Sequence, residues 1–222
     1  FELGAHAVGG GSTIDFERML DGAESLAEVV GIVTEGLTNA VYVEVQKALV
    51  AAYNDMPATN RYSGSWNGDE MVKLMNVVRA YGQPVIFACP EFVAAMGPDA
   101  IVPVATGTGQ GVYSPKDIEG IHDTGFISTF RGATVVQIPQ SFVDENNVET
   151  YVNPRLAYVM PGGAEKVVKV VLEGSTQIRD FENRDNSMEV YAWKKMGCAI
   201  LHHNNWAIYE NTGLTDTSAK DI

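Results

Sequence analysis

The residues best suited to bind a metal or to move a proton, the histidines, are scattered along this 222-residue chain. Only His202 and His203 are adjacent, and adjacent residues of a strand point to opposite faces, so the pair cannot chelate one ion by itself. His6 and His122 come with no metal-ligand spacing. His122–Asp123 could form half of a proton relay, but the chain has no G-x-S-x-G nucleophile elbow. We therefore predict no metal site and no catalytic residue, and place the histidines at the surface or at interfaces.

The glycine-rich stretch TGTGQG, Thr106–Gly111, is the strongest candidate for a phosphate-binding loop. A P-loop needs Lys and then Ser or Thr after its last glycine, whereas Val112 follows here. A dinucleotide fingerprint needs the spacing G-x-G-x-x-G, which this stretch does not provide. We predict no cofactor, and instead a mobile surface loop that takes a definite conformation only in an assembly. The acid pairs Asp144–Glu145 and Asp180–Glu182 lie in charged stretches and are expected to be solvated.

The composition indicates an ordinary core and an acidic surface. The chain is 45% hydrophobic and 19% charged, with a formal net charge of −13. Nucleic acid and anionic lipid attract Lys and Arg, so such a surface favours neither, although solubility alone also explains the acidity. Cys89 and Cys198 are flanked by apolar residues and are expected to be core thiols in a reducing compartment. Neither cysteine is in a recognised catalytic context. No run approaches the roughly 20 apolar residues of a membrane helix, so no membrane contact is predicted.

The longest regular pattern is Ser12–Tyr53, where apolar or small residues recur every three or four positions. This spacing is typical of one face of an α-helix. Ser12 can cap the helix. The preceding residues Phe1–Gly11 are small and glycine-rich, which predicts either a flexible entry or the end of a longer upstream segment. Gly31 and Gly36 weaken the helix and predict a bend or break. Two interpretations stay open: a nearly continuous spine helix, which the uninterrupted apolar phase favours, or two helices packed as a hairpin.

The rest of the chain alternates between helices and apolar strands, as in α/β proteins. After a polar linker at Met56–Gly68 we predict a helix at Asp69–Tyr81, a strand buried on both faces at Pro84–Cys89 and a short helix at Pro90–Met96. Within Phe126–Pro139 we predict two strand pieces joined at Arg131–Gly132. An exposed loop at Ser141–Asn153 and a strand at Arg155–Met160, stopped by Pro161, are predicted next. Long strands follow at Glu165–Leu172 and Ser187–Met196, joined by a turn-rich connection at Glu173–Asn186, then short strands at Cys198–Leu201 and Trp206–Tyr209.

The order of these elements resembles that of the major capsid protein of tailed bacteriophages, the Hong Kong 97-type fold, which encapsulins share. DEMVKLMNVVRAYGQPVIFACPEFVAAMG resembles the helix, buried strand and short helix of that family's axial domain. STFRGATVVQIP resembles its recurring "-l-G-pvv" strand, and EVYAWKKMGCAILHHNNWAIYE its closing pair of strands. The resemblance covers roughly residues 12–212. No motif is chemically diagnostic by itself, so order and spacing carry the resemblance.

The resemblance implies an α+β chain with two domains. A peripheral domain would hold residues 12–62, with the spine helix, and residues 161–203, with the long strands. An axial α/β domain would hold residues 63–160, together with the closing strand and tail at residues 204–222. Residues 1–11 would be the end of the family's extended loop or arm, and the complete N-terminal arm and extended loop are not expected in this chain.

The resemblance also implies a structural function rather than an enzymatic one. The chain would be a major capsid protein that self-assembles into the icosahedral head shell around a tailed phage's double-stranded DNA. Its partners would be copies of itself in pentamers and hexamers, scaffolding, portal and decoration proteins, and packaged DNA without sequence-specific binding. It would reside in the virion after assembly in the cytoplasm of the host bacterium. Two alternatives stay open: an encapsulin-like nanocompartment with protein cargo, and a small α/β enzyme with an unrecognised site.

Overall fold

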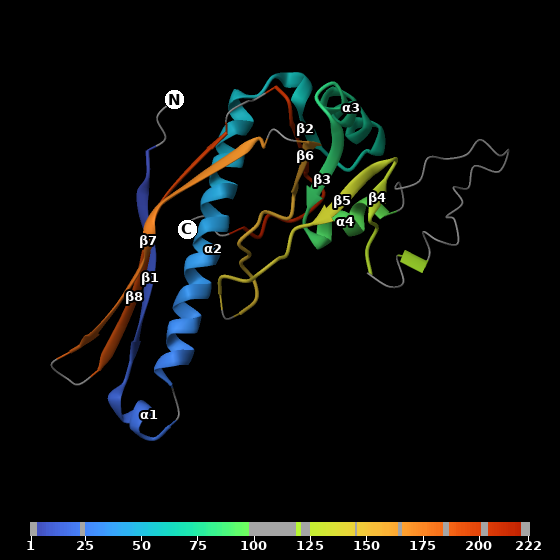
Figure 1. Cartoon of the computed structure of the whole chain (residues 1–222). Helices are drawn as coiled ribbons and strands as arrows, with labels where there is room; N and C mark the ends of the chain where they lie inside the picture. The colour runs from blue at the N-terminus through green and yellow to red at the C-terminus, as the bar shows by residue number, and fades with distance from the viewer. Residues whose placement is uncertain are drawn as a thin grey trace. The chain divides into compact units, whose positions relative to one another are not determined.

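The fold consists of two compact units, each built from segments distant in the chain. The computed structural model describes residues 4–22, 25–97, 119–120, 125–144, 146–163, 166–183, 187–200 and 204–218. Unit 1 comprises Phe1–Leu49 and Val168–Ile200, and unit 2 comprises Val50–Val167 and Leu201–Ile222. In chain order the helices and strands are β1 (His6–Ile14), α1 (Phe16–Leu20), α2 (Leu26–Ala52), β2 (Arg61–Gly64), α3 (Gly68–Arg79), β3 (Gln83–Ala88), α4 (Pro90–Met96), β4 (Thr129–Phe130), β5 (Ala133–Gln137), β6 (Leu156–Gly162), β7 (Val168–Glu182), β8 (Met188–Ile200) and β9 (Ala207–Asn211) (Figure 1).

Unit 1 is an antiparallel sheet of order β1-β8-β7 with α2 packed on one face. Alternate residues of β8 face the helix, and Val190 and Ala192 are each only 1% exposed. They pack against Val29, Val33 and Leu37, which lie one turn apart along α2. The two-residue period of the strand and the 3.6-residue period of the helix thus meet in one core.

The glycines of β1 allow a close approach to the neighbouring strand. A Cβ atom on Gly9 would lie 2.6 Å from the carbonyl oxygen of Ala192 and 2.8 Å from Cβ of Trp193. A Cβ on Gly11 would lie 2.5 Å from the ring of Tyr191. Cβ atoms do not approach other atoms so closely, so the pairing of β1 with β8 requires glycine at Gly9. The flexible entry predicted over residues 1–11 is wrong from His6 onward, because these residues form a paired strand.

The predicted start of the spine helix is also wrong. Ser12 lies in β1, opposite Val190, and the long helix begins only at Leu26. Its cap is Ser25, whose Oγ accepts a hydrogen bond from the Glu28 amide at 3.2 Å, while the Glu28 carboxylate accepts one from the Ser25 amide at 3.3 Å. This reciprocal arrangement is a capping box. The 27-residue helix then runs without a break through both interior glycines, so the near-continuous spine is confirmed and the hairpin alternative is wrong.

Helix α2 contradicts the expectation that no segment has the composition of a membrane helix. The stretch Leu26–Asp55 is long and apolar enough to cross a membrane by length and composition. Many of its residues are small or weakly apolar, so the run is less conspicuous in sequence than a block of leucines. In unit 1 the first half of the apolar stripe of this helix, at Val29, Val33 and Leu37, packs against β8. The packing is therefore that of an amphipathic helix on a sheet, with Glu28 and Glu35 on exposed positions.

The two long strands of unit 1 extend beyond their predicted ends. Most of the predicted turn-rich connection Glu173–Asn186 continues β7, which has 15 residues. The turn-like residues of the predicted connection coincide with a shift in the pairing of β7 with β8 between Glu173 and Gln177, where Gly174 has a φ of +74°. Such a bulge needs a residue that tolerates positive φ. The described part of the predicted short strand Cys198–Leu201 is the end of β8 and not a separate element.

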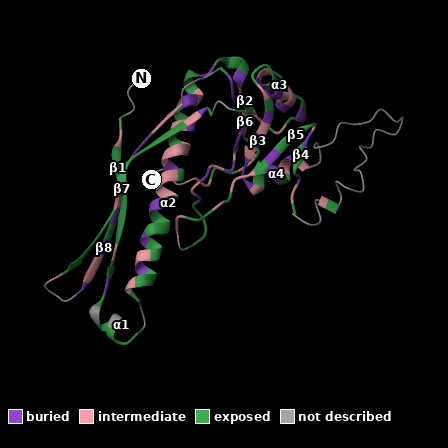
Figure 2. Cartoon of the chain, in the orientation of Figure 1, coloured by how far each residue is buried: buried purple, intermediate pink, exposed green. Residues whose placement is uncertain are grey.

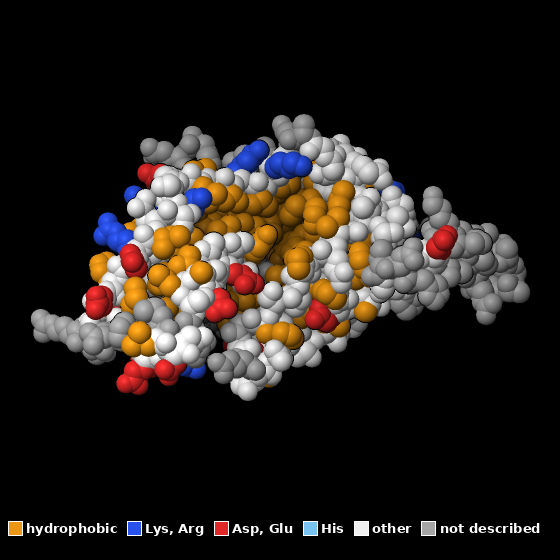
Figure 3. Space-filling view, turned by 60° about the horizontal axis from the view of Figure 1, so that its bottom comes forward, with side chains coloured by type: hydrophobic (Ala, Val, Ile, Leu, Met, Phe, Trp, Pro, Cys, Tyr) orange, Lys and Arg blue, Asp and Glu red, His pale blue; other side chains and the backbone are white. Residues whose placement is uncertain are grey.

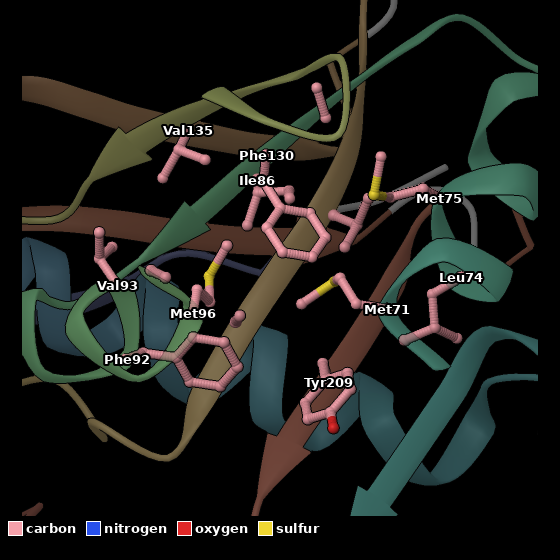
Figure 4. Packing of buried hydrophobic residues seen from close by; sticks show 14 of the residues in the cluster. Met71, Leu74, Met75, Ile86, Phe92, Val93, Met96, Phe130, Val135 and Tyr209 are labelled. Carbon is pink, nitrogen blue, oxygen red and sulfur yellow. The ribbon is translucent and has the colours of Figure 1, made fainter. Parts of the chain in front are cut away.

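Unit 2 is a mixed sheet of order β2-β9-β6-β3-β5-β4 with a core that includes α3 and α4. Strand β3 lies between antiparallel β6 and parallel β5. Figure 4 shows the core formed by Met71, Leu74, Met75, Ile86, Phe92, Val93, Met96, Phe130, Val135 and Tyr209. In β3, Ile86 and Ala88 are fully buried, whereas Val85 and Phe87 are only partly covered, so the strand is less buried on its second face than predicted.

The helices and the hairpin of unit 2 follow the sequence pattern closely. Helix α3 begins at Gly68, one residue before the predicted start, because the side chain of Asn67 accepts hydrogen bonds from the amides of Asp69 and Glu70. Helix α4 has the predicted bounds. The predicted strand pieces β4 and β5 pair across a two-residue turn at Arg131 and Gly132, whose φ angles are +43° and +86°. Positive φ at both positions is the hairpin turn whose twist matches that of the strands.

Two further predictions in unit 2 need correction. The predicted linker Met56–Gly68 contains β2, which pairs parallel with β9. Its position depends on distant residues, because the Asn60 side chain donates hydrogen bonds to the carbonyls of Asn204 and Trp206 at 2.9 and 2.7 Å. Strand β6 also continues through Pro161, which was expected to stop it. Strand β9 pairs only with the first four residues of β6, so one side of β6 is an edge at Pro161, where proline is tolerated.

Candidate assembly surfaces

The described residues bring together no group of three or more His, Cys, Asp or Glu that could hold a metal ion. His6 lies on β1, where its Nε2 is 3.3 Å from the Glu44 carboxylate of α2. The other candidates from the sequence, Thr106–Gly111, His122–Asp123 and His202–His203, lie outside the described residues. The absence of a catalytic or metal site stays a prediction for the chain.

Both cysteines are free thiols, and Cys89 is buried whereas Cys198 is partly exposed. Burial, with a smaller contribution from Glu91, raises the pKa of Cys89 to about 12. Burial also raises the pKa of Cys198, and the negative charge of Glu44 adds to the effect. The reactive form of cysteine is the thiolate, which a raised pKa disfavours at neutral pH.

Unit 1 exposes an unusually long edge. Strand β7 forms one side of the sheet, and nearly all of its residues are exposed, as the green colour along it shows (Figure 2). Its exposed apolar residues are Val170, Val171, Leu172, Ile178 and Phe181. An edge strand presents unpaired backbone donors and acceptors that can pair with another chain. This edge is therefore a candidate surface for contact with another subunit.

The face of the sheet that points away from α2 carries an aromatic cluster. Phe181 and Tyr191 place their ring centroids 6.2 Å apart in an edge-to-face arrangement. The guanidinium of Arg179 lies 5.4 Å from the ring centroid of Trp193, a cation–π geometry. Tyr191 also donates a 2.6 Å hydrogen bond to Glu189. Aromatic residues and arginine are enriched at protein–protein interfaces, so this face is a second candidate for contact.

Unit 2 contains a pocket of about 310 Å³ between the segment at residues 141–154 and the segment at residues 212–218. We call it the loop pocket. Its apolar lining comprises Phe142, Val148, Pro154 and Leu214, and Glu91 at the start of α4 contributes a carboxylate. Hydrophobic side chains also reach the surface in several areas of the face shown in Figure 3.

One aspartate holds the loop that forms this pocket. The carboxylate of Asp144 accepts hydrogen bonds from the amides of Asn146, Val148 and Glu149 at 3.2, 2.9 and 2.7 Å. These bonds, that from Glu149 first, hold the pKa of Asp144 below its usual value. The end of the loop is tied to the C-terminal segment, because the Thr150 amide donates to the Thr217 carbonyl at 2.8 Å. The pocket is thus formed by a loop with a defined conformation.

The family of the chain follows from a match along most of its length. Residues 5–205 match the family described as "SPbeta prophage-derived putative capsid protein YonB". The chain belongs to this capsid protein family. Comparison with curated proteins found no significant match. The suspected identification as a phage capsid protein is confirmed.

Solved structures with the same fold come from phages and from an encapsulin. The chain is similar to a structure titled Mycobacterium phage Che8, with a TM-score of 0.65 and 13% identity over 94% of this chain and 72% of that one. It is similar to the SrpI encapsulin of Synechococcus elongatus PCC 7942, with a TM-score of 0.60 and 15% identity over 98% and 76%. A procapsid chain of satellite phage P4 gives a TM-score of 0.62 and 8% identity over 97% and 73%. These matches confirm the Hong Kong 97-type fold.

The family and the fold together make the chain a structural major capsid protein, whose place is the capsid of a virion. The encapsulin alternative is not better supported, because the match to the encapsulin, with a TM-score of 0.60, is no closer in structure than the two phage matches above, with TM-scores of 0.65 and 0.62. Capsid proteins act by self-assembly into a shell. Surfaces that join copies are therefore the functional sites of this chain. Sequence reasoning did not identify them, because residues such as the exposed apolar positions of β7 have the same pattern as any other strand.

Proposed function

We propose that this chain is the major subunit of an icosahedral head shell that encloses the double-stranded DNA of a tailed phage, and that it catalyses no reaction. The observation that carries the proposal is the match to a capsid protein family over residues 5–205 of a chain with the Hong Kong 97-type fold. The exposed edge of β7 supports it, because shell subunits must present surfaces that neighbouring subunits complete.

In this proposal the peripheral domain comprises residues 12–62 and 161–203, and the axial domain comprises residues 63–160 and 204–222. The packing of α2 with β8 in unit 1 and the separate helix-covered sheet of unit 2 support two domains, whereas residues 50–62 and 161–167 of the proposed peripheral domain belong to unit 2 in the structure. Residues 1–11 would be the end of an extended loop or arm.

Copies of the chain would join in pentamers and hexamers through heterologous contacts, which close a ring when the rotation between neighbours allows it. Many weak contacts repeated around a shell add to a stable particle by avidity. Scaffolding, portal and decoration proteins would be further partners, and assembly would take place in the host cytoplasm. A net charge of −13 suits a container for DNA, because a lining with few cations lets the duplex pack without adhering.

The test is expression of the full-length protein with any scaffolding partner it needs, followed by sedimentation and negative-stain microscopy at neutral pH. We expect closed particles hundreds of ångströms across, because many subunits of tens of ångströms meet edge to edge. A homogeneous monomer or dimer at all protein concentrations would contradict the proposal. Particles isolated from the host should protect DNA from nuclease, whereas an enclosed protein in place of DNA would favour the nanocompartment.

A further inference from the structure

We propose that the side chain of Tyr81 on one copy of the chain occupies the loop pocket of the next copy. The proposal rests on the proposed function, since such a contact repeated between copies builds a ring of unit 2. It concerns one pair of surfaces, so it can fail while shell formation holds.

The loop pocket has the character of a preformed receptor for an apolar group. Phe142 and Val148 in its lining are 50% and 63% exposed, although both are large hydrophobic residues. Their backbone is held by the Asp144 hydrogen bonds and by a Val143 amide to Glu149 carbonyl bond of 2.8 Å. Exposed apolar side chains on an ordered frame mark surfaces that gain from being covered.

Tyr81 has the complementary character. It follows α3 and is 53% exposed, so about half of the residue's surface contacts solvent. Its backbone is fixed, because its amide donates to the Val78 carbonyl at 2.9 Å and the next amide, of Gly82, donates to the same carbonyl at 3.2 Å. A large aromatic side chain on a rigid turn can be buried in a partner with little loss of conformational freedom. Tyrosine is among the residues enriched at the energetic centres of interfaces.

Size and charge match as well. The volume of about 310 Å³ is at the low end of the range for binding pockets, which suits one large side chain rather than an extended ligand. Arg79 is exposed two residues before Tyr81, and Glu91 is exposed in the pocket lining. Arg79 uses one guanidinium nitrogen to bond the Asn76 side chain at 3.0 Å, and its other N–H donors can reach a partner. The cation of Arg79 beside Tyr81 and the carboxylate of Glu91 in the pocket lining thus have opposite signs.

The contact cannot form within one chain. Tyr81 precedes β3 and Glu91 follows it, so the two features lie at opposite ends of a six-residue strand. That separation is about 20 Å at roughly 3.3 Å per residue. A protruding group at one end and its receptor at the other make a head-to-tail contact, which generates rings or open chains of copies. A second copy of this chain is therefore the occupant that the geometry favours.

A disulfide between copies tests the contact directly. In the full-length protein with Cys198→Ser, the pair Tyr81→Cys and Val148→Cys should form intermolecular disulfides on mild oxidation, visible as a ladder of dimers, trimers and larger species on a non-reducing gel. The matched control pairs Tyr81→Cys with Val136→Cys, because Val136 is also an exposed valine of unit 2 but lies outside the pocket lining. We expect at least tenfold more cross-linked chain in the first pair than in the control.

Equal cross-linking of the two pairs, or none in either, would overturn the proposal whether or not closed particles form. A disulfide between the two cysteines of one chain would show that Tyr81 and the loop pocket are close within one copy, which contradicts the proposed contact between copies. Dimers formed by Val148→Cys alone would show a two-fold contact at the pocket instead. Particle formation by the chain without cysteine substitutions, followed by microscopy, reports on the proposed function separately.

A charge exchange gives a second readout. Arg79→Glu and Glu91→Arg should each lower the fraction of chain in particles or rings at least threefold, and the double variant should restore it. Tyr81→Phe should assemble like the parent chain, whereas Tyr81→Ala should not. Circular dichroism of each variant checks that the subunit is folded. Independent effects of the two charge variants, with no restoration, would contradict a direct contact between Arg79 and Glu91.

Discussion

At the scale of single residues, polar side chains fix the conformation of segments that hydrophobic patterning leaves undefined. Asn67 caps α3, Asn60 ties β2 to distant carbonyls, and Asp144 orders the loop of the loop pocket. Each bond compensates backbone groups that would otherwise lack a partner. The cap of α3 could be inferred from sequence, because Asn stands before an amphipathic run, but the partners of Asn60 lie more than 140 positions away.

The carboxylate of Asp144 makes the loop sensitive to acid. Its pKa is lowered in the folded state, chiefly by the Glu149 amide. A lowered folded pKa means that the stabilisation is present above the unfolded pKa and is lost as pH falls through the folded pKa. We therefore expect the amides of Val148 and Glu149 to lose protection from hydrogen exchange at acid pH, relative to the intrinsic exchange rate at the same pH.

Asp144→Asn should weaken this pH dependence and lower the protection of the same amides at neutral pH, because the charged acceptor is gone. Asp21→Asn, at an exposed position in unit 1, is the matched control and should leave these amides unchanged. A pH profile identical in the parent chain and Asp144→Asn would show that the carboxylate does not order the loop.

At the scale of elements, local signals predicted the helices of unit 2 and the central strands, and non-local pairing determined the rest. Helices α3 and α4 and the β4–β5 hairpin are encoded by caps, apolar spacing and turn residues within a few positions. Strands β1 and β2 were missed because their residues show no hydrophobic alternation, and only pairing with β8 and β9 makes them strands. The glycines of β1 led to the prediction of a flexible segment, whereas the structure requires glycine at position 9 because β8 lies close to it.

This difference gives a stability prediction for β1. Gly9→Ala should destabilise the folded protein by about 1–3 kcal/mol, the usual cost of forcing extra volume into a packed site. The new Cβ would meet the backbone oxygen of Ala192, which cannot rotate away. Gly10→Ala is the matched control, because no atom lies within 4 Å of a Cβ at that position. The free energy of unfolding from denaturant titration distinguishes the two variants, and equal values would show that β1 is not held close to β8.

At the scale of the whole molecule, the acidic charge opposes association while the exposed apolar surfaces favour it. Each copy carries a formal charge of −13, so copies repel one another at low ionic strength. The acidic charge could be predicted from the sequence, but which surfaces meet depends on residues far apart in the chain, such as those of β7 or the loop pocket.

Raising the salt concentration should therefore promote assembly. Between about 0.01 and 0.15 M salt the screening length falls from about 30 Å to about 8 Å, which reduces repulsion between neighbouring copies. We expect the particle fraction, measured by light scattering and sedimentation, to rise over this range, with sucrose of equal osmolality as the control. A steady fall with salt would mean that attractive ion pairs, rather than apolar contacts, dominate the interfaces.

The discontinuity of both units has a consequence during synthesis on the ribosome. Strand β8, the middle strand of unit 1, emerges about 150 residues after Leu37, which packs with it. At a synthesis rate of about 5–20 residues per second, the apolar stripe of α2 has no β8 to pack against for roughly 8–30 s. Unit 2 likewise lacks β9, which joins β2 to β6, until translation passes Asn211. A chain released before β8 is made can complete neither sheet, so such a truncated product lacks the surfaces that the two sheets would offer to neighbouring copies.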